Sequence, residues 1–158
     1  AVRIYIPATG VDIGRDALLP RTVHAVTDEL RDLLPGDVEE VLEAVAMNAA
    51  TDESLRVLAA LAASGETVYP LRVVIAAEIE EKKTAHVEGE DILPTALQLV
   101  EPVGWEDVVS FHVDDAKAAN DVVLAIGGDA AALERVTDDE DLMWFDVEER
   151  GRLIEYFG

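Results

Sequence analysis

The stretch LRVVIAA, residues 71–77, decides the fold. Apart from Arg72 it is a continuous apolar run, and three of its members are β-branched. Such a run is typical of a strand that is buried on both faces of a sheet. We therefore expect residues 71–77 to lie inside a sheet, with other strands on both sides.

The longest periodic segment lies immediately upstream, between residues 37 and 65. Its apolar residues recur at helical spacing, and Gly65 is a natural C-terminal stop. The polar segment TDES at 51–54 could divide it, because Thr51 or Asp52 could cap a second helix. We favour one long helix. The pattern includes Val38, Val41, Leu42, Val45, Leu55 and Leu58.

Four further segments read as strands, and they are VRIYI (2–6), TVHAVT (22–27), TALQLV (95–100) and VVSFHV (108–113). A charged, exposed connection separates residues 77 and 95, and DDED at 138–141 reads as a solvated turn. Helices are expected at about 115–126 and in the C-terminal tail. This order predicts a single α+β domain over residues 1–158, with a mixed sheet of about five strands packed against one long helix and a helical C-terminus.

Composition restricts the partners. The chain has 34 acidic and 12 basic residues and a net charge of −22. Phosphate backbones and anionic lipid repel such a surface, so neither nucleic acid nor a membrane is an expected partner. The acidity is explained by solubility or by adaptation of the host to salt. The chain has no cysteine, which fits a cytoplasmic location.

The stretch VSFHVDD, residues 109–115, raises the question of whether it forms a catalytic or binding site. Ser110, His112 and Asp114 alternate and therefore share one face of the predicted strand. We interpret them mainly as the polar face of an edge or half-exposed strand, with Asp114 or Asp115 capping the helix that follows. A hydrolase triad is disfavoured, because the strand offers no sharp turn to present the serine.

The alternative is a ligand-binding or catalytic site at the end of this strand. His112, Asp114 and Asp115 would supply its polar groups, and Arg3 or Tyr5 on the first strand could join them. These donors are too few to predict a metal site, and we expect no metal and no cofactor. A concave pocket that holds these side chains would favour the alternative.

The C-terminal tail is aromatic. Four of the eight aromatic residues lie in the last fifteen positions, namely Trp144, Phe145, Tyr156 and Phe157. Aromatic side chains bury large apolar areas, so we expect the tail to be ordered, either on its own core or against a partner subunit. A homodimer is therefore a possible assembly.

Three blocks carry a resemblance to a known family: RIYIPAT at 3–9, RVVIAAEI at 72–79 and VGWEDVVSFHVDDA at 103–116. Together they resemble a family of uncharacterised actinobacterial proteins, a domain of unknown function. The resemblance implies a bacterial, cytoplasmic protein and assigns no catalytic residue. We predict a soluble protein that acts through self-association or protein binding, with the ligand site near His112 as the alternative.

Overall fold

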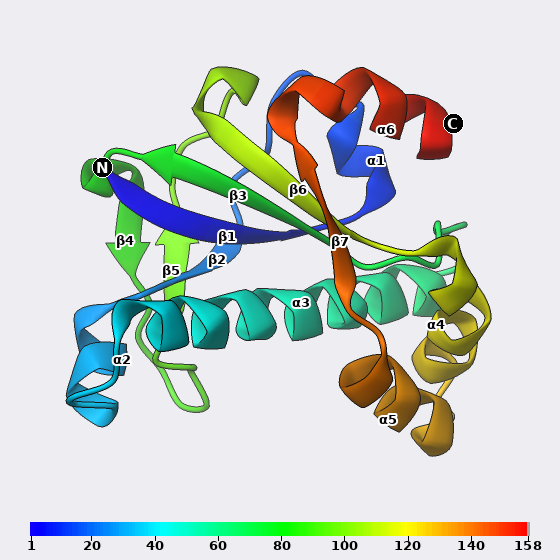
Figure 1. Ribbon diagram of the computed structural model, residues 1–158, viewed down its shortest axis with the longest axis horizontal. Helices are drawn as coiled ribbons and strands as arrows, with labels where there is room; N and C mark the ends of the chain where they lie inside the picture. The colour runs from blue at the N-terminus through cyan, green and yellow to red at the C-terminus, as the bar shows by residue number, and fades with distance from the viewer. Residues whose placement is uncertain (158) are drawn as a thin grey trace.

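The computed structural model describes residues 1–157 of the chain. At its centre lies a seven-stranded sheet with the order β4-β5-β2-β1-β3-β6-β7 (Figure 1). All neighbouring strands are antiparallel. The strands are β1 (Val2–Ala8), β2 (Thr22–Ala25), β3 (Val73–Ile79), β4 (Thr84–His86), β5 (Ala96–Leu99), β6 (Val108–Asp114) and β7 (Leu142–Asp146).

The predicted α+β class is confirmed, but the prediction of a mixed sheet with about five strands is wrong. The two additional strands, β4 and β7, are the edges of the sheet. β4 has three residues and lies inside the segment predicted to be a charged connection, and β7 follows the acidic turn. Strands this short carry little periodic signal of their own, so tertiary pairing decides their formation.

β3 lies inside the sheet, as its apolar sequence predicts. It pairs with β1 on one side and β6 on the other, with Ile4 opposite Ala77 and Val74 opposite His112. Val73, Val74, Ile75, Ala76 and Ala77 have no exposed surface. The antiparallel pairs place β6 between β3 and β7, so β6 is not an edge strand.

The predicted long helix is continuous and forms α3 (Glu39–Ala63). It crosses one face of the sheet (Figure 1). Small side chains on its inner side allow close packing, because alanine keeps the helix axis near the strands. The contact joins Ala46 and Ala50 of α3 to Tyr5, Val74 and Ala76 of the sheet.

A buried serine fixes α3 on the sheet. The Ser54 hydroxyl donates to the carbonyl oxygen of Ala8 at 2.7 Å and accepts from the amide of Val73 at 3.0 Å. Ser54 has no exposed surface. The polar segment 51–54 therefore does not break the helix; one of its members joins the helix to the ends of β1 and β3.

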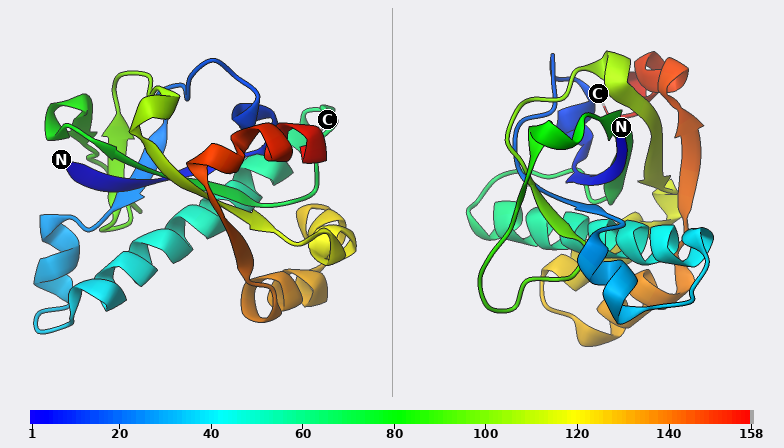
Figure 2. Two further views of the ribbon diagram at one scale, coloured as in Figure 1. Left: turned by 45° about the horizontal axis from the view of Figure 1, so that its top comes forward. Right: turned by 90° about the vertical axis from the view of Figure 1, so that its left-hand side faces the viewer.

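The opposite face carries the larger core. α1 (Gly10–Ile13) and α6 (Arg150–Phe157) cover this face, as Figure 2 shows. Phe111, Ile75 and Ile4 point into it from three adjacent strands and are fully buried. The C-terminal tail is helical, as predicted, and closes the core with Leu153 and Phe157.

Three further helices complete the structure: α2 (Asp28–Leu33), α4 (Ala119–Ile126) and α5 (Ala130–Asp139). Short 3₁₀ turns η1 (Glu81–Lys83), η2 (Trp105–Asp107), η3 (Ala116–Ala118) and η4 (Val147–Glu149) link the elements. α4 packs against α3 and α5, so a helical pair stands beside the long helix. No helix in residues 1–157 combines the length and the apolar character that a membrane crossing requires.

Candidate functional site

The polar row of β6 faces α3 and is not a solvated strand face. Ser110 is 3% exposed, Asp114 is 0% exposed and His112 is half-buried. The prediction of a wet strand face is therefore wrong. The reason is topological: both faces of the sheet are covered by helices, and β7 protects the edge of β6.

Asp114 holds a buried arginine. Its Oδ1 accepts from Arg72 Nη2 at 2.7 Å, and its Oδ2 accepts from Nε at 2.9 Å and from the Arg72 backbone amide at 2.8 Å. The Arg72 side chain is 3% exposed. A buried charge of this kind is tolerated only when it is paired and hydrogen-bonded. Asp114 is therefore not a helix cap, whereas Asp115 is one: its Oδ1 accepts from the amide of Lys117.

A serine hydrolase triad is not assembled. Ser110 Oγ lies 3.1 Å from His112 Nε2, so the first half of a triad is present. The acid half is missing, because Asp114 accepts hydrogen bonds from Arg72 and not from His112. Ser110 is also too buried to meet a substrate.

The environment of His112 favours the neutral imidazole. Burial lowers its pKa below 6.5, and the positive charge of Arg3 lowers it further. Its Nε2 is used by Ser110, and among residues 1–157 its Nδ1 has no hydrogen-bond partner. The imidazole therefore offers a ligand one neutral nitrogen that can donate or accept.

Arg3 and Tyr5 share the sheet face with His112 but lie one strand farther away, because β3 separates β1 from β6. Arg3 pairs with Glu78 at 2.8 Å. Tyr5 is 7% exposed beneath α3, and burial, followed by the charge of Glu43, raises its pKa. Neither residue lines the cleft described below; Arg3 acts on His112 only through its charge, and Tyr5 is not grouped with His112.

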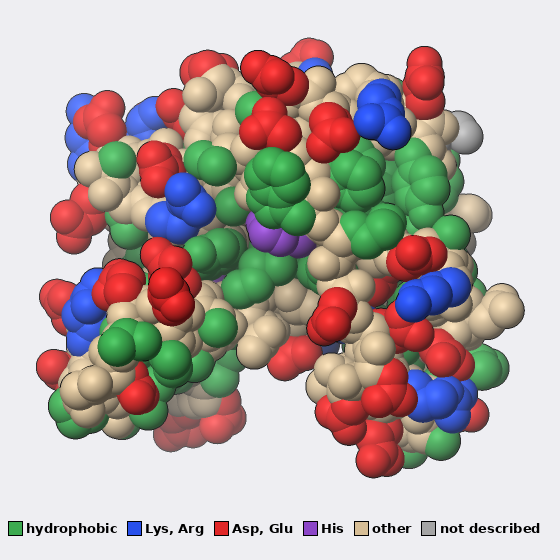
Figure 3. Space-filling view, in the orientation of Figure 1, with side chains coloured by type: hydrophobic (Ala, Val, Ile, Leu, Met, Phe, Trp, Pro, Cys, Tyr) green, Lys and Arg blue, Asp and Glu red, His purple; other side chains and the backbone are tan. Residues whose placement is uncertain are grey.

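A cleft of about 530 Å³ opens over His112 and Arg72, between α3 and the turn that joins α5 to β7. In Figure 3 this face of the molecule is hollowed between the surface over α3 and the block over α5. Its size lies in the range of small-molecule sites. The lining residues are Met47, Asn48, Thr51, Asp52, Arg72, His112, Thr137, Glu140, Asp141 and Leu142.

Arg72 forms part of the floor of this cleft and retains an unused donor. Its Nε and Nη2 bond Asp114, and Nη2 also donates to the carbonyl oxygen of Glu140 at 3.0 Å. Nη1 has no partner within residues 1–157. A guanidinium group that is almost wholly buried and lines a cavity is a ready donor to a bound oxygen.

Most of the cleft was not predicted from sequence, although two signals were present. Arg72 is the only charged residue in the run 71–77, and such an interruption marks a buried polar group that requires a partner. The second signal is the polar segment 51–54 inside an apolar helix. Asp141 was assigned to a solvated turn, and only the fold places it beside α3.

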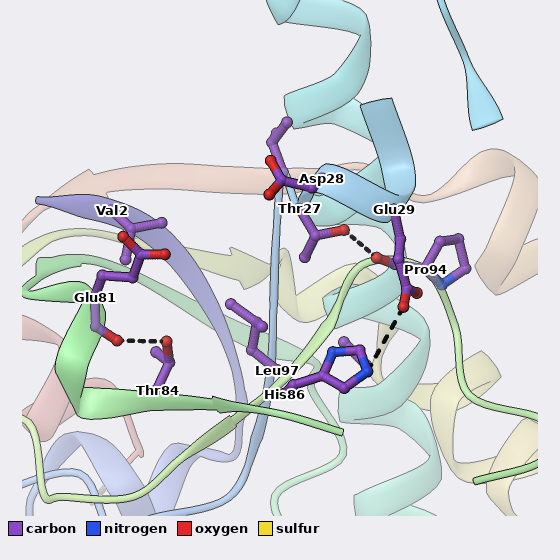
Figure 4. Close-up of a pocket in the computed structure, with 11 residues that line it drawn as sticks. Val2, Thr27, Asp28, Glu29, Glu81, Thr84, His86, Pro94 and Leu97 are labelled. Carbon is purple, nitrogen blue, oxygen red and sulfur yellow. Dashed lines mark hydrogen bonds and ion pairs between the residues drawn. The ribbon is translucent and has the colours of Figure 1, made fainter. Parts of the chain in front are cut away.

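A second pocket, of about 350 Å³, lies at the far end of the sheet (Figure 4). Val2, Leu97 and Pro94 contribute apolar surface to it, and part of its polar rim is internally paired. Thr27 bonds the Pro94 carbonyl oxygen, Thr84 bonds the Glu81 carbonyl oxygen, and His86 lies 3.7 Å from Glu29. The pocket contains none of the predicted site residues.

The histidine of β2 belongs to a closed network. His24 Nδ1 lies 2.8 Å from Thr95 Oγ1, and His24 Nε2 lies 2.6 Å from Glu53 Oε1. His24 and Thr95 are each 1% exposed. A hydroxyl, an imidazole and a carboxylate are thus aligned as in a triad, but the hydroxyl is closed to substrate. The network joins α3 to β2 and to the residue before β5.

The four aromatic residues of the C-terminal tail fall into two groups, one packed on the core and one exposed. Phe157 is 4% exposed and packs in the core, and Phe145 packs against the same core. Trp144 is 60% exposed on the edge strand β7, and Tyr156 is 47% exposed on α6. The tail thus packs on the chain's own core through Phe145 and Phe157, and Trp144 and Tyr156 remain available to a partner.

Fold and cleft together define a class of α+β protein, in which a long helix and a helical pair form a polar cleft against one face of an antiparallel sheet. A family model matches residues 2–154, and the chain belongs to this family, described as a family of unknown function (DUF6912). The expected relation to a domain of unknown function is confirmed. Comparison with curated proteins and with solved structures gives no match.

Proposed function

We propose that this protein binds a small polar molecule in the cleft over Arg72 and His112. The observation that carries the proposal is the unused donor of Arg72, an almost wholly buried guanidinium that lines a cavity of about 530 Å³. Neutral His112 lies on the same floor and adds a second hydrogen-bonding group. Binding sites typically combine a preformed cavity with a few placed polar groups of this kind.

Of the residues expected at the site, His112 lines the cleft and Asp114 acts through Arg72, whose orientation it fixes. Asp115, Arg3 and Tyr5 have no place in the proposal. No bond-making step is proposed, because the cleft presents no activated nucleophile: the hydroxyl nearest to His112 belongs to buried Ser110.

A thermal-shift panel of small polar metabolites tests the proposal. A ligand that binds only the folded state must raise the unfolding temperature. Asn48 is an exposed residue of α3 at the cleft, so Asn48→Trp fills the cavity without disturbing the core. Ala60→Trp is the matched control, because Ala60 is exposed on the same helix and lines none of the cavities described above.

We expect at least one compound to stabilise the wild-type protein and Ala60→Trp, and to have no effect on Asn48→Trp. A panel without effect on the wild-type protein contradicts the proposal. The same holds for a compound that stabilises all three proteins equally, because it binds elsewhere.

A second candidate function is self-association along β7, supported by the exposed Trp144 on a terminal strand. An edge strand offers unpaired backbone groups to a second copy of the chain. Light scattering after size exclusion tests it. We expect a dimer that strengthens with salt, since salt screens the net charge of −22. Trp144→Gln should dissociate it, whereas Leu33→Gln, an exposed apolar residue on α2, should not. A monomer at every salt concentration contradicts self-association.

A further inference from the structure

We infer that the ligand of this cleft is an organic cation that also carries an oxygen acceptor, such as a hydroxylated primary amine. The inference rests on the proposed function and specifies the ligand class. It is drawn from the charges that line the cleft, from the unused donor on its floor and from the spacing of its carboxylates.

The cleft carries unbalanced negative charge. Asp52, Glu140 and Asp141 line it, and none of them forms a salt bridge within residues 1–157. The positive charge of Arg72 is neutralised by Asp114 at 2.7 Å. Three carboxylates therefore remain without a counter-charge, in a protein with a net charge of −22. A cation is attracted to such a cavity and an anion is repelled.

The unused donor of Arg72 on the cleft floor favours a ligand that carries a hydrogen-bond acceptor. Arg72 Nη1 is the donor left over after Nε and Nη2 have bonded Asp114 and the Glu140 carbonyl. Nη1 opens to the cleft that Arg72 lines, so it can donate to an acceptor atom on the ligand. A hydroxyl or carbonyl oxygen supplies that atom without the repulsion that a carboxylate would meet from Asp52 and Asp141.

The carboxylates do not converge on one point. Within residues 1–157, no group of three or more His, Cys, Asp or Glu side chains has the arrangement of a metal site. Dispersed carboxylates around a cavity of about 530 Å³ suit a cation whose charge and hydrogen-bonding atoms are spread over several ångströms. A bare metal ion requires convergent ligands, so the geometry points to an organic cation.

Three hexose derivatives of similar size test the charge class directly at a pH below 7, where glucosamine is cationic, glucose is neutral and glucuronate is anionic. Isothermal titration calorimetry at low ionic strength gives the dissociation constant of each. We expect glucosamine to bind at least about tenfold more tightly than glucose, which corresponds to about 1.4 kcal/mol, and glucuronate to bind most weakly.

Two double variants that remove the same number of charges distinguish the effect of the cleft carboxylates from the effect of the overall negative charge. Glu140→Gln/Asp141→Asn removes two cleft carboxylates, whereas Glu134→Gln/Asp138→Asn removes two exposed carboxylates of α5 that do not line the cleft. We expect only the first variant to lose the preference for glucosamine.

Equal or tighter binding of glucose or glucuronate overturns the cation assignment and leaves the cleft as a binding site. An equal loss of preference in both variants also overturns it, because the attraction is then unspecific. If none of the sugars binds, the inference is overturned, and the metabolite panel with Asn48→Trp decides the proposed function separately.

Discussion

Arg72, the residue before β3, and Asp114, the last residue of β6, form a two-pronged salt bridge, with Nη2–Oδ1 at 2.7 Å and Nε–Oδ2 at 2.9 Å. Their side chains are 3% and 0% exposed. The pair connects fold and site, since it closes the sheet beneath the cleft and orients the guanidinium that forms part of the cleft floor. Loss of one partner leaves an uncompensated buried charge.

Arg72→Met should therefore lower the free energy of unfolding by about 3–5 kcal/mol. Arg72→Met/Asp114→Leu should recover most of that loss, because no charge is then left buried. Urea unfolding at neutral pH measures both variants. If Arg72→Met costs less than about 1 kcal/mol, the bridge is solvated and Arg72 is not a buried floor residue.

His112 should make stability depend on pH. Its pKa lies below the ordinary 6.5, because burial and the charge of Arg3 disfavour the imidazolium form. As pH falls below 6.5, the unfolded chain takes up this proton before the folded chain does. The contribution of His112 to the free energy of unfolding is therefore fully present above pH 6.5. It is lost as the pH falls through the lowered pKa.

His112→Asn should flatten this part of the stability profile, measured by urea unfolding across the acid range. His86→Asn is the matched substitution, because His86 is exposed on β4 and lies outside the cleft over His112. An NMR titration that gives His112 a pKa above 6.5 would contradict the buried, neutral imidazole.

Thr95→Val should destabilise the protein by about 1–3 kcal/mol, since it removes the hydroxyl bonded to His24 Nδ1 and leaves that nitrogen buried without a partner. Thr67→Val, at an exposed position, should change stability by no more than about 0.5 kcal/mol. Equal effects of the two substitutions in thermal unfolding would show that the His24 network contributes nothing.

Gly10 lies against the aromatic ring that closes the core. A Cβ at this position would lie 2.8 Å from Phe157 Cε1 and closer still to Cδ1. Gly10→Ala should therefore cost about 1–3 kcal/mol, and the smaller side chain in Gly10→Ala/Phe157→Leu should reduce the conflict.

Gly151→Ala is the matched control for Gly10. An added Cβ meets nothing within 4 Å there, and the residue lies in α6, so the change should stabilise the protein by about 0.5–1 kcal/mol. A stable Gly10→Ala variant would contradict the docking of Phe157 on α1.

The elements with a long or strongly apolar pattern could be predicted from sequence. α3 has 25 residues of helical spacing and β3 has a continuous apolar run, and both lie where the pattern indicates. The edge strands could not be predicted, because the LMWFD segment that forms β7 is short and follows an acidic turn. Its strand conformation comes from pairing with β6.

The site was predicted only in part, because it too depends on contacts between distant parts of the chain. Alternation correctly placed His112 and Asp114 on one face, but it does not indicate what covers that face. Whether such a row is wet or buried depends on α3 and on the strand order, which are non-local properties. Arg72 and Asp114 are 42 residues apart, so their pairing also depends on the fold.

The central claim is that ligands bind over Arg72 and His112, and NMR of the histidine rings tests it most directly. The chain has three histidines, His24, His86 and His112, so each ring can be followed separately. A compound that raises the unfolding temperature should shift the His112 ring resonances and the Arg72 Nε signal, and leave His24 and His86 unchanged. A stabilising compound that moves His86 or His24 while His112 stays fixed would contradict the account.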